Sequence, residues 1–214
     1  MAKKLSSIRR DYKKLKLDRK HVSSDPFVQF EKWMEETLHS DLPEPTAMIL
    51  STVSRDGTPS SRVVLLKGVS DGSLFFYTNY DSEKGRNLSE NPKAAITFFW
   101  PELERQINIK GEVQKTEGEI SDDYFSGRPR KSQLGAWASE QGKELSSREE
   151  LIKKFMVLSL KYVGRKVPRP PFWGGYGLKP STFEFWQGRP NRLHDRIQYL
   201  KNDQGDWYVR RLSP

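Results

Sequence analysis

Between Thr46 and Lys115, hydrophobic and polar residues alternate in short runs, which is the pattern of β-strands buried on one face. Two of the intervening turns contain an Asp-Gly pair, at 56–57 and 71–72, and this pair accepts the positive φ angles of tight hairpin turns. The predicted strands are TAMILSTV, SRVVLLK, SLFFYT, AAITFFW and RQINIKGEVQK. Short successive strands predict an antiparallel sheet curled into a barrel, and SEKGRNLSENP is predicted to be a turn within it.

Helical periodicity appears on both sides of this region. Asp25 is suited to the N-cap and Pro26 to the first position of a helix that runs to about residue 38. Ser147 and Glu150 form a capping box before a second helix, and Gly164 stands where its C-cap belongs. Shorter helices are predicted in EGEISDDYFSGRP and SQLGAWASEQ, and closing strands in YGLKPSTFEFWQG, DRIQYLK and DWYVRRL.

The composition favours one folded domain with a basic extension. A chain of 214 residues is long enough for one domain, but 35% hydrophobic residues is low for a compact monomer and favours a dimer. The net charge is +9, and residues 1–20 alone hold nine Lys or Arg and two Asp. We therefore expect a basic arm at 1–20, a candidate lid, and a nearly neutral folded domain at 21–214.

Several classes of protein are excluded by what the sequence lacks. No apolar run is long enough to span a membrane and no secretory signal is present, so we expect a cytoplasmic protein without a membrane partner. With no cysteine, disulfides, thiolate nucleophiles and iron–sulfur clusters are excluded. His21, His39 and His194 lack zinc spacing, so no metal is expected. Redox chemistry would require a bound cofactor.

Common nucleotide-binding motifs are absent. GRPRKS resembles the end of a Walker loop, but the required glycines would fall at Phe125 and Arg130. WGGYG does not have the Rossmann spacing, and no G-x-S-x-G nucleophile elbow occurs, although spacing alone leaves a Ser-His-Asp triad open.

Two stretches are suited to phosphate. In SRVVLLK, Arg62 and Lys67 are five residues apart on one predicted strand, so we expect their side chains on opposite faces of the sheet unless a bulge intervenes. The two cations could then serve two different anionic groups. In YFSGRPRKS, two arginines and Tyr124 gather before a predicted helix that Ser132 is expected to cap. Taken alone, each stretch is also consistent with solvated charged side chains beside a strand or a helix end.

A third stretch, FEFWQGRPNRLHDR at 183–196, places three aromatic residues directly before a cluster of arginines around His194. The clustered arginines predict a lowered pKa for His194 and a neutral imidazole. Arg192 and His194 alternate along the chain, so we expect both to face the same side.

Taken together, the chain resembles the pyridoxine 5′-phosphate oxidase (pyridoxamine-phosphate oxidase) family from about Arg9 to its end. The matching segments are RRDY, DPFVQFEKW, PTAMILSTV, SRVVLLKG, FYTNYDSEKG, NP, ERQINIKGEV, YFSGRPRKSQLGAW, FWGGY and EFWQGRPNRLHDR. The resemblance implies a mainly β fold with flanking α-helices, an FMN-binding split β-barrel, and a homodimer with FMN at the subunit interface. It also implies oxidation of pyridoxine 5′-phosphate or pyridoxamine 5′-phosphate to pyridoxal 5′-phosphate, with O2 as electron acceptor and H2O2 as product.

The resemblance also implies roles for individual residues. The FMN contacts would be Arg62, Val63, Leu66, Lys67, Tyr77, Thr78, Lys84, Gln106, Gln141, Trp186 and Arg196. The substrate phosphate would be held by Lys67, Tyr124, Arg128 and Ser132. Arg192 and His194 would flank the pyridine ring as the catalytic pair, with His194 also a candidate proton acceptor, and Arg9, Arg10 and Tyr12 would close over it.

Three positions depart from the family pattern. Glu83 stands where an arginine usually lies beside the FMN phosphate, and a carboxylate there would repel the phosphate. Gly142 follows Gln141 where a serine is usual, and Asp11 replaces a glutamate.

Two other functions compete with this reading. A related split-barrel flavoprotein with another substrate would bind FMN and ignore pyridoxine phosphate. A nucleic-acid-binding protein would lose salt-dependent affinity with residues 1–20, but the distributed motif match disfavours this, so we expect no nucleic-acid partner.

Overall fold

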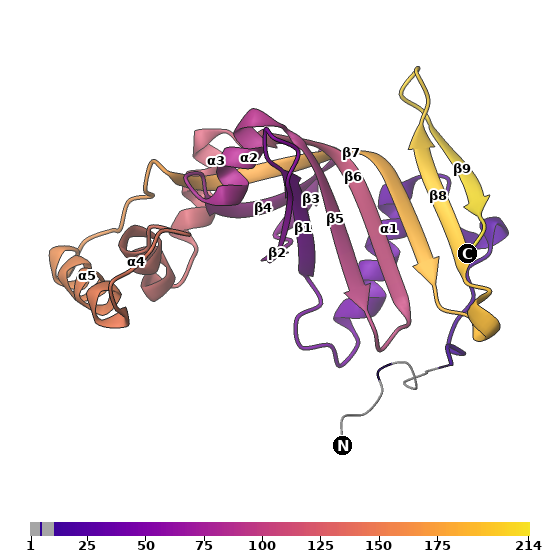
Figure 1. Ribbon diagram of the computed structural model, residues 1–214, viewed down its shortest axis with the longest axis horizontal. Coiled ribbons are helices and arrows are strands. Elements are labelled where there is room, and N and C mark those ends of the chain that lie inside the picture. The colour runs from indigo at the N-terminus through magenta and orange to yellow at the C-terminus, as the bar shows by residue number, and fades with distance from the viewer. Residues whose placement is uncertain (1–4, 6–10) are drawn as a thin grey trace. The chain divides into compact units, whose positions relative to one another are not determined.

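The computed structural model describes residue 5 and residues 11–214. Its described strands form one sheet in the order β2-β1-β5-β6-β7-β4-β3, to which β8 adds beside β7 and β9 beside β8 (Figure 1). The strands are β1 Ala47–Val53, β2 Pro59–Leu65, β3 Gly68–Ser70, β4 Ser73–Asn79, β5 Lys93–Trp100, β6 Arg105–Lys115, β7 Trp173–Gln187, β8 Asp195–Lys201 and β9 Trp207–Leu212. This mostly antiparallel, curled half-barrel with flanking helices confirms the predicted fold class.

Two of the described helices, α1 and α5, begin at the capping residues predicted from the sequence. They are η2 Arg19–His21, α1 Pro26–Leu38, α2 Glu83–Glu90, α3 Gly118–Ser126, α4 Arg130–Ala138, α5 Arg148–Lys161 and η3 Pro190–Arg192. The Asp25 carboxylate accepts the Phe27 N–H at 2.7 Å and caps α1 as predicted. Ser147 caps α5 by accepting the Glu150 N–H, although the Glu150 carboxylate returns to Ser146 rather than to Ser147.

The chain divides into two compact units. One unit comprises residues 1–49, 95–110 and 180–214, and the other comprises residues 50–94 and 111–179. In the first unit, α1 packs on the sheet through Phe30 against Phe98, with ring centroids 5.4 Å apart, and through Trp33 against Phe185 at 5.1 Å. All four side chains are buried, and they form the core that the helical spacing predicts.

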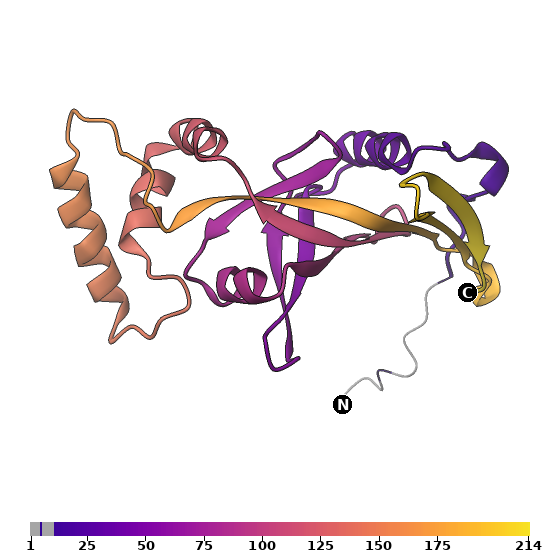
Figure 2. The same ribbon diagram turned by 90° about the horizontal axis from the view of Figure 1, so that it is seen from above.

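In the second unit, α4 and α5 pack side by side (Figure 2). They share a hydrophobic cluster that contains Phe125, Leu134 and Trp173, and Phe155 of α5 packs against it. Trp173 is the first residue of β7, which pairs with β4 so that Gly175 lies opposite Tyr77. The cluster therefore joins the helical segment to the sheet beside Tyr77.

The segment 83–90 is a helix, so the predicted turn is wrong. Ser82 caps this helix by accepting the Gly85 N–H at 3.3 Å. The buried side of α2 includes Lys84 and Asn87, whose polar groups are satisfied by hydrogen bonds inside the fold. Because polar side chains occupy the buried face, the hydrophobic periodicity that announces a helix is missing.

None of the described helices is both long and apolar enough to cross a bilayer.

Candidate functional site

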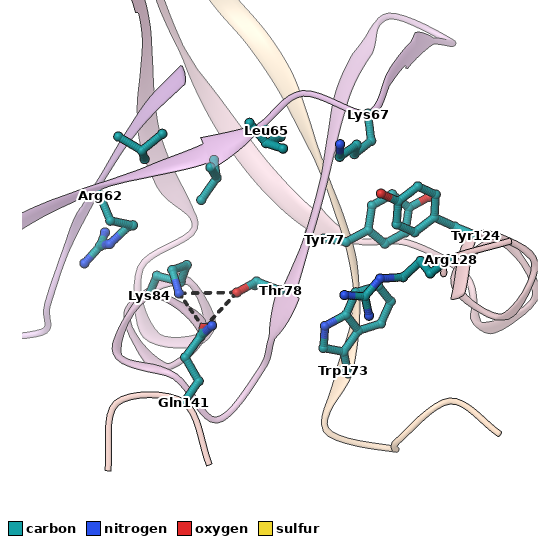
Figure 3. Close-up of a pocket in the computed structure, with 12 residues that line it drawn as sticks. Arg62, Leu65, Lys67, Tyr77, Thr78, Lys84, Tyr124, Arg128, Gln141 and Trp173 are labelled. Atoms are coloured by element: carbon teal, nitrogen blue, oxygen red, sulfur yellow. Dashed lines mark hydrogen bonds between the residues drawn. The ribbon is translucent and has the colours of Figure 1, made fainter. Parts of the chain in front are cut away.

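A cavity of about 490 Å³ opens in the second unit, between β2, β4, α2 and the start of β7 (Figure 3). It is lined by Arg62, Val63, Val64, Leu65, Lys67, Tyr77, Thr78, Lys84, Tyr124, Arg128, Gln141 and Trp173. Nine of these twelve were predicted from the sequence, and Val64, Leu65 and Trp173 were not. Figure 3 shows Lys84, Thr78 and Gln141 at one end, with Lys67, Arg128 and the aromatic side chains at the other.

Lys84 gives the first end of the cavity a desolvated positive charge. Its Nζ donates to Gln141 Oε1 at 2.7 Å, Ser82 Oγ at 3.2 Å and Thr78 Oγ1 at 3.3 Å. The pKa of Lys84 is lowered to about 8, first by burial and then by the charge of Arg62, while Glu83 opposes the shift. These hydrogen-bond partners are all neutral, so an anion at this end would stabilise the ammonium.

Arg62 contributes the second cation at this end. Its Nη1 donates to Thr52 Oγ1 at 2.7 Å and its Nη2 donates to Ser60 Oγ at 2.7 Å. Nη2 also lies 3.4 Å from the carboxylate of Glu83. The guanidinium is therefore fixed by side chains of the sheet.

Arg62 and Lys67 line the same cavity, so the expectation that they face opposite sides of the sheet is wrong. The strand β2 ends at Leu65, which leaves Lys67 outside it. Lys67 directly precedes β3, and its N–H donates to Phe75 O of β4 at 2.8 Å. Strand alternation stops before Lys67, whereas Leu66 turns into the protein and is buried.

Arg128 dominates the opposite end of the cavity. Its guanidinium lies 4.5 Å from the ring centroid of Trp173, a cation–π contact. Its Nη1 is buried and, among the described residues, has no hydrogen-bond partner. A buried donor without a partner costs about 1–3 kcal/mol, or more when charged. An anionic ligand would remove this cost.

Tyr124 and Tyr77 form an aromatic wall beside Arg128. Their rings stack with centroids 3.7 Å apart and an interplanar angle of 12°. Burial raises the pKa of both phenols, which keeps their hydroxyl groups protonated. A neutral phenol beside a guanidinium is a suitable pair of donors for a phosphate.

Ser132 does not cap the following helix, so that prediction is wrong. It is the third residue of α4, whose N-cap position is Pro129, and its own N–H donates to Pro129 O at 2.8 Å. The turn is held instead by Gln133, whose buried amide donates to the carbonyls of Phe125, Ser126 and Arg128 at 2.9–3.0 Å. Gln133 thus fixes the backbone that carries Arg128.

The first unit holds a second cluster of predicted residues around Trp186. The ring of His194 lies 4.7 Å from Trp186, and Tyr12 packs edge-on at 5.7 Å from each of them. Arg196 lies opposite Trp186 in the β7–β8 register and pairs with Glu184 at 2.9 Å. Of the other predicted residues, Gln106 is the second residue of β6, whereas Arg9 and Arg10 fall outside the described residues.

His194 has a defined hydrogen-bond arrangement. Its Nδ1 accepts the N–H of Arg189 at 3.1 Å, so the neutral ring carries its proton on Nε2. Burial lowers the pKa of His194, Arg192 lowers it further, and Asp195 opposes the shift. The predicted direction is confirmed, but burial rather than the arginines is the largest cause.

Arg192 and His194 both precede β8, so they lie in a turn and not along a strand. The segment before β8 is the turn η3, in which Asn191 and Arg192 have φ angles of 57° and 61°. Positive φ angles at two consecutive residues turn the chain here. The direction of the Arg192 side chain is therefore set by the backbone conformation and not by strand alternation.

Family models match most of the chain. Residues 34–162 match the model described as pyridoxamine 5′-phosphate oxidase, and residues 173–214 match that of the pyridoxine 5′-phosphate oxidase C-terminal dimerisation region. The chain belongs to the pyridoxamine 5′-phosphate oxidase family. It is thus an enzyme of this oxidase family, with the family's dimerisation region at its C-terminus.

Full-length relatives agree with this assignment. The chain is 49% identical over 214 residues to the pyridoxine/pyridoxamine 5′-phosphate oxidase of Chromobacterium violaceum, covering 100% of both chains. It is 48% identical to the protein of the same name from Salinibacter ruber, covering 99% of both.

Among solved structures, PhzG from Burkholderia lata is 32% identical, with a TM-score of 0.89 over 96% of this chain and 100% of that chain. That structure is a complex with tetrahydrophenazine-1-carboxylic acid. An FMN-binding protein from Nostoc punctiforme is 16% identical, with a TM-score of 0.71 over 89% of this chain and 98% of its own, and shares the fold.

Besides Val64 and Leu65, three residues that shape the candidate sites of this oxidase were not predicted from the sequence. Trp173 lies within the matching segment FWGGY and could have been found there. The buried side chains of Gln133 and Glu104 form hydrogen bonds to backbone groups of other segments of the chain, and no local sequence pattern predicts such hydrogen bonds.

Proposed function

We propose that the protein is an FMN-dependent oxidase that converts pyridoxine 5′-phosphate or pyridoxamine 5′-phosphate to pyridoxal 5′-phosphate. O2 is the electron acceptor, H2O2 is the second product, and the enzyme acts as a cytoplasmic homodimer. The observation that carries the proposal is a single cavity with a cationic group at each end and an aromatic wall at one of them. Two phosphate-bearing aromatic molecules, a flavin and a pyridine, require such a pair of anion sites.

Lys84 and Arg62 fit the phosphate of FMN. The Lys84 ammonium is buried among neutral acceptors, and Arg62 is preorganised by Thr52 and Ser60. Thr78 and Gln141 line the same end and add a hydroxyl and a carboxamide. The chemistry that bound FMN supplies is acceptance of a hydride from the 4′-carbon of the substrate and delivery of both electrons to O2.

Arg128, Tyr124 and Lys67 fit the phosphate of the substrate. The Nη1 of Arg128, which has no partner within the described part of the chain, is the donor that a phosphate oxygen would satisfy, and Tyr124 and Lys67 line the same end. Anchoring the phosphate restricts the pyridine to one orientation, which is the main task of the protein in a hydride transfer. Ser132 is exposed, and its assignment to this site rests on the resemblance alone.

His194 and Arg192 are assigned to the pyridine ring. Because Nδ1 of His194 accepts from Arg189, the neutral imidazole presents its Nε2–H as a donor to a substrate acceptor atom. We therefore assign His194 to orienting the ring rather than to accepting a proton. Trp186, Arg196 and Gln106 are assigned to the flavin, as the resemblance implies.

Aerobic turnover tests the proposal. Purified protein with added FMN and pyridoxine 5′-phosphate should form pyridoxal 5′-phosphate and H2O2 in equal amounts. Arg192→Ala and His194→Ala should retain bound flavin and lose most of the turnover. A flavin-bound protein that forms neither product would contradict the proposed substrate.

A second substrate class is favoured by one observation, the similarity to PhzG over nearly the whole of both chains. That protein binds a tricyclic carboxylic acid without a phosphate. If this chain acted on such molecules, Arg128→Ala would leave flavin reduction by a dihydrophenazine carboxylate intact and pyridoxine phosphate would not reduce the flavin. Anaerobic flavin bleaching with each compound separates the two candidates.

A further inference from the structure

A carboxylate contacts Arg62, one of the two cations that line the end of the cavity assigned to the FMN phosphate. Glu83 is the first residue of α2 and directly precedes Lys84. Its Oε2 lies 3.4 Å from Nη2 of Arg62, and its side chain is 63% exposed whereas that of Arg62 is 18% exposed. Glu83 therefore contacts the guanidinium of Arg62 from the solvent-exposed side.

The position of Arg62 does not depend on Glu83. Thr52 Oγ1 and Ser60 Oγ each accept from the guanidinium at 2.7 Å. Asn87 of α2 donates to both of these oxygens at 3.1 Å and holds them in place. An exposed ion pair at 3.4 Å adds little to this network. The contact can thus break while the guanidinium keeps its place.

The charge of Glu83 stays near the cavity even when the pair breaks. The residue lies in the first turn of α2, where the helix dipole favours a carboxylate, and Ser82 caps the same turn. Lys84, the next residue, feels the charge of Glu83. An incoming phosphate therefore meets two cations together with one fixed carboxylate.

We propose that Glu83 is an internal competitor for the flavin phosphate: it pairs with Arg62 in the free protein and must be displaced when the phosphate binds. This inference rests on the proposed function, in which FMN is the cofactor. A phosphate monoester carries a charge of about −1.5 to −2 at neutral pH, so the remaining carboxylate repels it. Glu83 then weakens binding of FMN without weakening binding of riboflavin, and it makes the cofactor exchangeable.

Titration of the apoprotein with FMN and with riboflavin, followed by quenching of flavin fluorescence, tests this inference. Glu83→Gln should lower the Kd for FMN about three- to tenfold and leave the Kd for riboflavin unchanged, because riboflavin has no phosphate. Glu83→Arg should lower the Kd for FMN further. Glu90→Gln, at the exposed far end of α2, is the matched control and should change neither Kd.

The possible outcomes separate this inference from the proposed function. If wild-type protein binds FMN and Glu83→Gln has the same Kd for FMN or a higher one, the competitor role is wrong and the proposed cofactor stands. Equal tightening of FMN and riboflavin also overturns it, since the effect would then not act on the phosphate. If neither the wild type nor the variants bind FMN, the proposed function fails together with this inference.

Discussion

The carboxylate of Glu104 accepts the backbone N–H of Lys13 at 2.9 Å, and the same oxygen accepts the N–H of Lys14 at 3.0 Å. Glu104 is only 3% exposed and adopts a φ of 55°, so the fold holds its side chain in one place. Tyr12, the residue before Lys13, packs on Trp186. One buried carboxylate therefore fixes residues 13–14 of the basic arm beside the cluster around Trp186.

Glu104→Ala should release this segment of the arm. Two charge-assisted hydrogen bonds are lost, each worth about 1.5–3 kcal/mol, so we expect KM for pyridoxine 5′-phosphate to rise at least about tenfold. The Kd for FMN should not change. Steady-state kinetics at saturating FMN measures the first effect, and faster trypsin cleavage after Lys13 or Lys14 reports the released segment. The neighbouring exposed Glu102→Ala is the control.

Gly188→Ala tests the same contact if Glu104→Ala does not fold. A Cβ at Gly188 would lie 2.7 Å from Cγ of Tyr12 and must push the ring away. An unchanged KM in both variants would show that the arm does not cover the site.

Arg128→Ala should weaken binding of the phosphorylated substrate. The variant removes the donor at the phosphate end, and we expect KM to rise about 10- to 100-fold, in line with a charged hydrogen bond of about 1.5–3 kcal/mol. Unphosphorylated pyridoxine should show no difference between wild type and variant. Arg130→Ala is the matched control, because that guanidinium bonds to the carbonyls of Tyr162 and Arg165. Equal losses for both substrates would exclude a phosphate-specific role.

The sequence predicts the strands well because their alternating burial is local information. In β1 and β5 the buried and exposed positions alternate as the residue pattern requires. The helix α2 was not predicted because its buried positions include Lys84 and Asn87, whose polar groups form hydrogen bonds to distant segments of the chain. Burial of such polar side chains depends on partners elsewhere in the fold, so the sequence shows no hydrophobic periodicity at these positions.

The sequence predicted which residues line the candidate site better than it predicted how those residues are arranged. Arg62 and Lys67 line one cavity because the strand ends between them, and a strand end cannot be read from alternation alone. Ser132 is not the cap because the helix already begins at Arg130, two residues earlier. The orientation of His194 depends on a hydrogen bond from the N–H of Arg189. The intervening turn contains two positive φ angles, and the residue pattern did not predict this turn.

Lys84 should make both stability and cofactor affinity depend on pH. Its pKa falls from an ordinary 10.5 to about 8 in the folded protein, so between these values the unfolded chain binds more protons. The free energy of unfolding of the apoprotein should therefore rise with pH in this window, and Lys84→Met should remove the rise. Chemical denaturation at pH 7.5 to 9.5 measures it. An unchanged slope in Lys84→Met would assign the pH dependence to other groups.

The affinity for FMN, in contrast, should fall as the pH rises. The phosphate favours the charged ammonium, so above a pH of about 8 the apoprotein must take up a proton on binding, and the Kd for FMN should increase by up to about tenfold per pH unit. Lys84→Arg keeps its charge and should show a nearly flat Kd over the same range. Riboflavin is the control ligand. A pH-independent Kd in the wild type would mean that Lys84 does not contact the phosphate.

His194 should impose an acidic limb on the pH profile of kcat/KM. Burial and Arg192 hold its pKa below the ordinary 6.5, so the ring is neutral at physiological pH. Protonation would place an N–H on Nδ1 opposite the N–H of Arg189, which breaks their hydrogen bond and turns the ring. Activity should therefore rise with pH through the pKa of His194.

Arg192→Gln removes one cause of the lowered pKa, so the same limb should move to higher pH even where overall activity falls. Arg210→Gln, on β9 and bound to Gln198, is the control and should leave the limb in place. The position of the limb separates an electrostatic role of Arg192 from a purely steric one, because a steric loss lowers activity equally at every pH. A limb that stays fixed in Arg192→Gln would show that burial alone sets the protonation of His194.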